Sequence, residues 1–223
     1  MNARDVLYSL LPASGEGMRS AHYADLAVRL RDLACSAGSA TAEQFERNAI
    51  AAGSTVLRCN RSDAAERFVA HARGKSCVVL AEDMLLRTLG IDERLLAQLP
   101  GISVFNGASA PDRDVRSFNA ADIGVTAALA GIADSGAVIA AVSHGETRSV
   151  SLLSDEHVAF LPVERIVPTL HAAAPLLEEL VRVEKKSAVT LIGGPSKTAD
   201  IEKVLVTGVH GPGTLTVVLI ETP

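Results

Sequence analysis

At 223 residues, the chain is long enough for one large domain, or for one domain with a small appendage. A net charge of -5 without any basic block argues against nucleic-acid binding, and aromatic residues at only 3% leave few platforms on which bases could stack. Apolar residues make up 48%, but few of them are aromatic and Trp is absent, so the core must be aliphatic, which suits a parallel sheet covered on both faces.

The three cysteines are widely spaced and form no Cys-x-x-Cys pair, so the sequence carries no iron–sulfur or zinc motif. His144, His157 and Asp200 do not have the spacing of a known metal site, and we predict no metal. No apolar run approaches the length of a membrane span, and the first residues lack the apolar core of a signal peptide. We therefore expect a cytoplasmic protein with no membrane contact.

The chain is predicted to begin with helices. Residues 20–35 place apolar side chains at helical spacing, and a second helix is predicted to begin at Thr41, which has capping-box spacing to Gln44, and to stop at Gly53. We predict an N-terminal helical appendage over residues 1–53, followed by an α/β domain over residues 54–223.

From residue 54 onward, predicted strands and helices alternate. Strands are predicted at 55–59, 76–80, 102–105, 136–142, 158–161, 188–192 and 214–220. Helices are predicted from Asp63 to Gly74, over 83–98 with a break near Gly90, and over 168–182, where Pro175 marks either a kink or the first turn. Residues 122–126 fit a strand or a helix start, and 106–119 and 143–157 are predicted loops.

This alternation predicts a three-layer α/β domain with a mostly parallel sheet. In such sheets ligands bind at the carboxyl ends of the strands. That rule selects the loops that follow Leu80, Phe105, Val142 and Ile192.

The most unusual stretch is the glycine-rich turn after the strand at 188–192, which is predicted to be buried. A helix predicted from Thr198 would aim its free backbone N–H groups at an anion, such as a carboxylate or a phosphate. The proposed ligand-binding residues are Gly193, Gly194, Ser196, Lys197 and Thr198. The alternative is that the glycines only form a tight turn and that Ser196 or Thr198 only caps the helix. The spacing does not match a P-loop.

Four further residues could contribute to a site. Glu146 could act as an acid or base beside Arg148, whose guanidinium could hold a carboxylate or phosphate, although such neighbours often form a surface ion pair. Asp134 could face the crevice, or it could belong to a turn between two extended segments. His210 could act as a general acid or base, or it could simply bond to backbone.

Several motifs together resemble the LUD-domain family, and in particular its lactate utilisation protein C group. They are Asp122-Ile123-Gly124-Val125-Thr126, residues 132–136, Arg148 with Ser151-Leu152-Leu153 and His157, residues 194–202, and Gly208-Val209-His210-Gly211-Pro212. The resemblance covers about residues 45–221 and is most specific in the last two segments, which include Asp200 as a further ligand-binding candidate.

The resemblance implies the fold of ribose-5-phosphate isomerase, CoA transferases and 5-formyltetrahydrofolate cyclo-ligase. It also implies a role in bacterial growth on L-lactate, in which two iron–sulfur partner proteins take part in oxidising L-lactate to pyruvate. We expect Arg148 and Lys197 to hold a small anionic ligand, with Glu146 or His210 moving protons. The alternatives are an independent ligase, isomerase or transferase acting on a nucleotide, CoA ester or sugar phosphate, and an interaction module.

Overall fold

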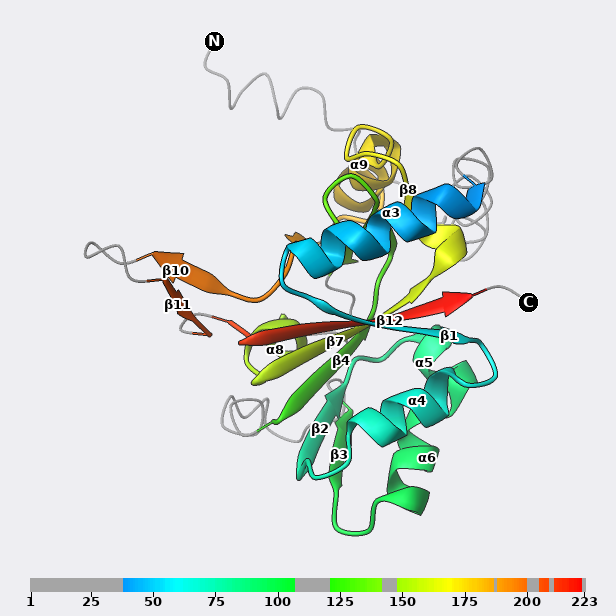
Figure 1. Cartoon of the computed structure of the whole chain (residues 1–223), viewed down its shortest axis with the longest axis vertical. Coiled ribbons are helices and arrows are strands. Elements are labelled where there is room, and N and C mark those ends of the chain that lie inside the picture. The colour runs from blue at the N-terminus through cyan, green and yellow to red at the C-terminus, as the bar shows by residue number, and fades with distance from the viewer. Residues whose placement is uncertain are drawn as a thin grey trace.

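A parallel six-stranded sheet forms the centre of the molecule (Figure 1). The computed structural model describes residues 38–106, 121–141, 148–186, 188–199, 205–208 and 211–221. The strand order is β1-β12-β7-β4-β2-β3, and every neighbouring pair runs parallel. The strands are β1 (Thr55–Asn60), β2 (Cys77–Leu80), β3 (Ser103–Asn106), β4 (Ile123–Ala127), β7 (Glu156–Pro162) and β12 (Thr214–Glu221).

The two faces of this sheet bury separate aliphatic cores, because successive residues of a strand point to opposite sides. On β7, Val158 and Phe160 join one core, while Ala159 and Leu161 join the other. The Phe160 ring meets Phe68 edge to face, with ring centroids 5.6 Å apart. β4 and β7 are buried along their whole length, as expected for short aliphatic strands covered on both sides.

Helices cover both faces of the sheet. Figure 1 shows α3 above the sheet and α4, α5 and α6 below it. The helices are α3 (Gly38–Ala51), α4 (Ala64–His71), α5 (Met84–Leu89), α6 (Ile91–Gln98), α8 (Ser149–Leu152) and α9 (Ala174–Arg182), with a 3-10 turn, η2, at Val163–Arg165. The predicted three-layer α/β architecture with a mostly parallel sheet and flanking helices is confirmed.

A second sheet lies apart from the first and has the order β8-β5-β6-β9. Its strands are β5 (Ala130–Ile132), β6 (Ala137–Ala141), β8 (Ile166–Val167) and β9 (Val189–Ile192). β5 and β8 are parallel, whereas β6 runs antiparallel to both β5 and β9. α9 packs against this sheet through Leu176 and Leu180. A two-stranded antiparallel ribbon, β10 (Lys197–Ala199) with β11 (Leu205–Thr207), projects from the body in Figure 1.

Two expectations about the glycine-rich stretch are wrong. The strand before it, β9, belongs to the second sheet and is only partly buried, with Leu191 43% exposed. The segment after it forms strand β10 and not the start of a helix, because Lys197–Ala199 pairs with β11. The strands that precede Val142 and Ile192 are antiparallel neighbours, so their carboxyl ends do not share one edge.

Most other elements lie where the sequence predicts them, with shifted ends. α3 begins at Gly38, so Thr41 lies inside the helix and does not cap it. Pro175 lies in the first turn of α9, so it marks the start of this helix and not a kink. Of the segment at 122–126, all but Asp122 belongs to strand β4, so its strand alternative is the right one. The predicted helix at 20–35 and nearly all of the predicted loop at 106–119 lie outside the described residues.

The predicted loop at 143–157 is wrong in its second half. It contains the short helix α8 and the start of β7, which begins at Glu156 and not at Val158. The division of the chain at residue 53 stays a prediction. Phe45 and Ala49 of α3 are fully buried in the core that also contains Leu161 of β7.

Candidate ligand-binding site

A surface pocket of about 210 Å³ lies where several sequence motifs meet. Its walls come from Ser151 and Leu152 of α8, from His157 of β7, from β9 with the turn that follows it (residues 190–194 and Ser196), and from the start of β12 with the turn before it (residues 211, 212, 214 and 215). His157 and Leu215 pair with each other near the amino ends of their strands. The pocket therefore lies at the edge of the sheet opposite to the predicted carboxyl-end crevice.

The glycine turn, defined as residues 193–196, is tied directly to the turn before β12. The backbone N–H of Ser196 donates to the carbonyl of Pro212 at 2.9 Å, and the N–H of Gly208 donates to the carbonyl of Ser196 at 2.9 Å. A Cβ on Gly211 would lie 3.2 Å from the Cβ of Ser196. The residues of these two motifs that line the pocket, Gly194 and Ser196 from one and Gly211 and Pro212 from the other, thus lie side by side in its wall.

Gly194 and Lys197 contact the end of α3. Gly194 has φ +117°, and a Cβ there would lie 2.7 Å from the carbonyl oxygen of Ala52, so this position requires glycine. The Nζ of Lys197 donates to the same oxygen at 3.1 Å. Lys197 therefore satisfies a carbonyl at the carboxyl end of a helix, where a cation is favourable. It is exposed and does not line the pocket.

The other predicted site residues are placed as follows. Gly193, Gly194 and Ser196 line the pocket. Thr198 lies in β10, opposite Val206. Arg148 is exposed immediately before α8, whose Ser151 and Leu152 line the pocket. Glu146, Asp200 and His210 lie outside the described residues.

Asp134 lies away from the pocket, in the turn between β5 and β6. Asn48 Nδ2 of α3 donates to the carbonyls of Ala133 and Asp134, at 2.7 Å and 3.0 Å. Gly136 has φ +66°, and a Cβ there would lie 2.1 Å from the backbone nitrogen of Ala49. This motif thus forms a tight turn beneath α3, as its alternative reading predicts.

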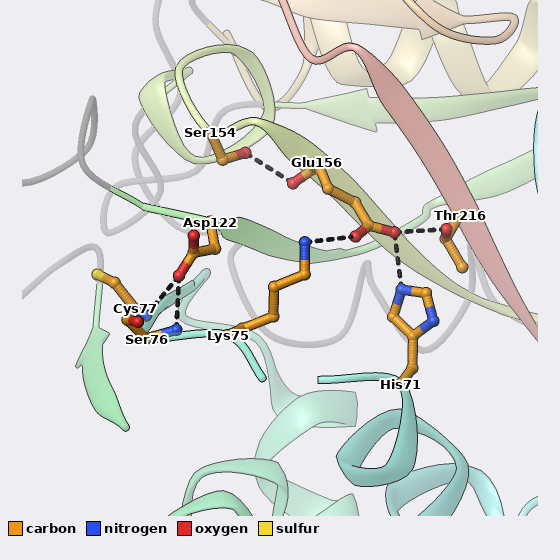
Figure 2. Close-up of polar contacts among 8 residues, drawn as sticks. All are labelled: His71, Lys75, Ser76, Cys77, Asp122, Ser154, Glu156 and Thr216. Atoms are coloured by element: carbon orange, nitrogen blue, oxygen red, sulfur yellow. Dashed lines mark hydrogen bonds and ion pairs between the residues drawn. The ribbon is translucent and has the colours of Figure 1, made fainter. Parts of the chain in front are cut away.

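The Asp122–Thr126 motif holds three parts of the structure together. Asp122 Oδ2 accepts hydrogen bonds from the backbone N–H groups of Ser76 and Cys77, at 2.6 Å and 2.9 Å (Figure 2). Gly124 has no side chain, and a Cβ there would lie 1.8 Å from the carbonyl oxygen of Val150, so glycine lets α8 lie against β4. Thr126 forms a hydrogen bond with His157.

His157 is the buried polar residue of the pocket wall. Its side chain is 1% exposed, and its Nε2 lies 2.9 Å from Thr126 Oγ1. Burial lowers the pKa of His157 to about 4, against the opposing charge of Glu156, so the imidazole is neutral near pH 7. No partner among the described residues reaches its Nδ1. The sequence interpretation missed this role because it started the strand one residue after His157.

Glu156 faces the other side of the sheet and organises a cluster of polar side chains (Figure 2). Its Oε1 accepts hydrogen bonds from His71 Nε2 at 2.7 Å and from Thr216 Oγ1 at 2.6 Å, and Lys75 Nζ lies 3.7 Å from Oε2. Burial alone would raise the pKa of Glu156, but the bonds from His71 and Thr216 outweigh it and leave that pKa lowered. This cluster fixes the start of β7 directly behind the pocket wall, and no sequence motif indicated it.

Comparison with known proteins identifies the family. The family model described as the LUD domain matches residues 42–220. The chain belongs to the LUD domain family. Its relatives include "Lactate utilization protein C" from Exiguobacterium sp., which is 37% identical over 135 residues, covering 58% of this chain and 59% of that protein. This LUD chain thus spans about three-fifths of that relative's length.

Two further proteins are similar to this LUD chain. "Uncharacterized protein YkgG" from Escherichia coli is 31% identical over 173 residues, covering 74% of each chain. The crystal structure of a DUF162 family protein from Deinococcus radiodurans superposes with a TM-score of 0.57 at 18% identity, covering 82% of this chain and 97% of that one. The structural likeness shows the shared fold.

No helix within the described ranges combines the length and the apolar character that crossing a bilayer requires. Nor do three or more His, Cys, Asp or Glu side chains come together there in a group that could hold a metal ion.

Proposed function

We propose that this LUD domain is a component of a bacterial L-lactate utilisation system and binds a small anionic ligand in the pocket beside His157. In this system it would work with iron–sulfur partner proteins that take part in oxidising L-lactate to pyruvate. Relatives named for lactate utilisation support the system. The observation that carries the ligand pocket is that its walls are built by three motifs far apart in the sequence: Ser151-Leu152, Gly193–Ser196 and Gly211-Pro212.

The charge for holding an anion would come from the rim of the pocket. Among the described residues that line it, none is Asp, Glu, Lys or Arg. Lys197 directly follows Ser196, and Arg148 lies three residues before Ser151, so both cations border the wall. To bind the ligand, Lys197 would give up its hydrogen bond to the Ala52 carbonyl and form one with the anion instead. This change needs only a rotation of an exposed, flexible side chain. Glu146 and His210 remain the proposed proton carriers, because Glu146 lies two residues before Arg148 and His210 directly precedes Gly211 in the sequence.

The test is growth on L-lactate. The gene is deleted in a host without another L-lactate dehydrogenase, and the deletion strain is complemented with the wild type, with Arg148→Gln, or with Arg61→Gln. Arg61 is the matched control, because it is exposed at the carboxyl end of β1, at the opposite edge of the sheet from the pocket. We expect the wild type and the Arg61 variant to restore growth and the Arg148 variant to restore it poorly. Normal growth of the deletion strain would refute the assignment to lactate utilisation.

A second candidate function is an independent enzyme acting on a nucleotide, a CoA ester or a sugar phosphate. The observation in its favour is that four residues lining the pocket, Ser151, Thr190, Ser196 and Thr214, carry hydroxyl groups that can donate hydrogen bonds to phosphate oxygens. A ligand present at 100 times its dissociation constant stabilises a protein by about 2.7 kcal/mol, which is readily measured as a rise in Tm. A rise with one of these phosphorylated compounds, and none with L-lactate or pyruvate, would favour this second function.

A further inference from the structure

Strand β9 forms an open edge of the second sheet. It pairs with β6 on one side, and no described strand pairs with it on the other. Its residues, Val189–Ile192, include no charged side chain and no proline, which are common devices that keep an exposed edge from pairing with another chain. The edge strand β1 of the central sheet does have such a device, since Arg58 forms ion pairs with Glu46 and Glu221. β9 can therefore pair with a further strand.

The pocket runs along this open edge. Leu191 pairs with Ile139, which belongs to the core that α9 covers, whereas Ile192 pairs with Val138, which belongs to the core that contains residues of α3. Since directly paired residues point to the same face of a sheet, Leu191 and Ile192 point to opposite faces. Both nevertheless line the pocket, as does Thr190. A strand added to β9 would therefore lie over the pocket and extend its wall.

Exposed apolar side chains continue from this edge onto α9. Four large apolar residues of the segment that contains α9 and β9 are each between 43% and 57% exposed: Leu170, Val181, Val183 and Leu191. α9 packs against β9, and Leu191 points to the α9 side of the sheet. Leu152 of α8, which lines the pocket together with Leu191, is also 38% exposed. Apolar side chains gathered in this way on a protein surface mark a contact with another protein.

A second copy of the chain matches this surface. Two β9 strands related by a two-fold axis perpendicular to the sheet pair antiparallel and keep both α9 helices on the same face. Because directly paired residues point to the same face, Leu191 would lie opposite Leu191 or Val189 of the second copy. No like charges would meet along the strand, because it carries none. The same axis would bring the two α9 helices toward each other, where Val181 would be covered.

We propose that this chain forms a two-fold dimer through β9, in which the second sheets of two copies join into one and each copy adds its β9 to the wall of the other's pocket. This inference goes beyond the proposed function, because it concerns assembly. β9 has only four residues and α9 only nine, so the buried area falls below the roughly 1,600 Å² of a standard stable interface. The dimer is therefore weak and reversible, with a dissociation constant in the micromolar range.

Analytical ultracentrifugation of the wild-type chain over a range of concentrations tests the dimer. We expect a reversible monomer–dimer equilibrium. Leu191→Lys and Leu191→Glu should each weaken the dimer about tenfold or more, because each brings two like charges close together across the axis. A mixture of the two variants should form a heterodimer, since the charges are then opposite. A wild-type chain that stays monomeric up to about 1 mM, or Leu191 variants that dimerise as well as the wild type, would overturn the proposal.

Phe105→Lys is the matched control, because Phe105 is 39% exposed on β3, the other uncharged edge strand. We expect this variant to dimerise normally, and loss of the dimer in it alone would place the interface at β3 and contradict the proposal. If the Leu191 variants do not fold, Val181→Lys on α9 replaces them and must weaken the dimer. A mixture of folded Leu191 variants that stays monomeric would also refute the pairing of β9.

The growth test is independent of this experiment. A reversible dimer that depends on Leu191, combined with normal growth of the deletion strain, would support the pairing of β9 and remove only the lactate-utilisation assignment. Impaired growth of the deletion strain, combined with a wild-type chain that remains monomeric, would remove the dimer and leave the proposed function standing.

Discussion

Replacing Gly124 by alanine should disrupt the packing of α8 on β4. A Cβ at this position would lie 1.8 Å from the carbonyl oxygen of Val150 and 2.6 Å from Ser154 Oγ. Carbon and oxygen atoms in contact are normally separated by about 3.3 Å or more, so the backbone of α8 would have to move by about 1.5 Å. The obstacle is a backbone atom, which cannot turn aside as a flexible side chain can.

The expected loss of stability follows from what that movement breaks. Overpacking alone typically costs about 1–3 kcal/mol. Val150 is 1% exposed, and lifting α8 would also expose part of its side chain, which is worth about 1.5–3 kcal/mol when fully buried. We therefore predict that Gly124→Ala lowers the free energy of unfolding by about 3 kcal/mol or more.

Urea unfolding at neutral pH measures this loss, with Gly213→Ala as the matched control. A Cβ on Gly213 would meet its nearest atoms at 3.9 Å, which is ordinary contact, and the residue is exposed. The control should stay within about 0.5 kcal/mol of the wild type. If Gly124→Ala unfolds at the same urea concentration as the control, then the close approach of α8 to β4 is not real, and neither is this explanation of the Asp122–Thr126 motif.

Two other substitutions test single contacts. The pKa of His157 is lowered to about 4 in the folded protein, so the unfolded chain binds more protons between its ordinary pKa of 6.5 and pH 4. The contribution of His157 to the free energy of unfolding should therefore be fully present above pH 6.5 and fall by up to about 3 kcal/mol as the pH drops to 4. In unfolding experiments at several pH values, His157→Gln should make the free energy of unfolding depend less steeply on pH over this range. Lys197→Met removes one exposed bond to the Ala52 carbonyl and should cost about 1 kcal/mol or less in urea unfolding, so a large loss would contradict that minor structural role.

The sequence predicted β1, β2, β3, β7 and β12 of the central sheet, because short aliphatic runs between polar breaks are typical of buried strands, but it left β4 open between a strand and a helix start and did not predict the strand order. It could not assign β9, since a run such as Val189–Ile192 has the same composition whether it enters the parallel sheet or borders a second one. The segment after Lys197 has polar residues at helix-like spacing. Its pairing with β11 is a tertiary contact that no local pattern encodes.

The pocket was only partly predictable for a similar reason. Sequence motifs located the glycine turn and the turn before β12, because glycine and proline mark the places where backbones approach closely. They did not reveal that Lys197 would reach the end of α3. His157 and Glu156 were hidden by a strand boundary placed two residues too late. The ends of helices and strands are the least reliable part of a sequence-based prediction, and here the misplaced start of β7 left the buried His157 outside the predicted strand.

The position of β12 has a consequence for how the chain acquires its structure. β12 is formed by residues 214–221, yet it lies between β1 and β7 and pairs with both. Among the described strands, β1 pairs only with β12, so during synthesis it stays unpaired in the central sheet until residues 214–221 have been made. The register joins residues far apart in the sequence, such as Thr55 and Thr216, and such distant pairing favours slow closure of the sheet. The pocket cannot form earlier, because the turn before β12 supplies one of its walls.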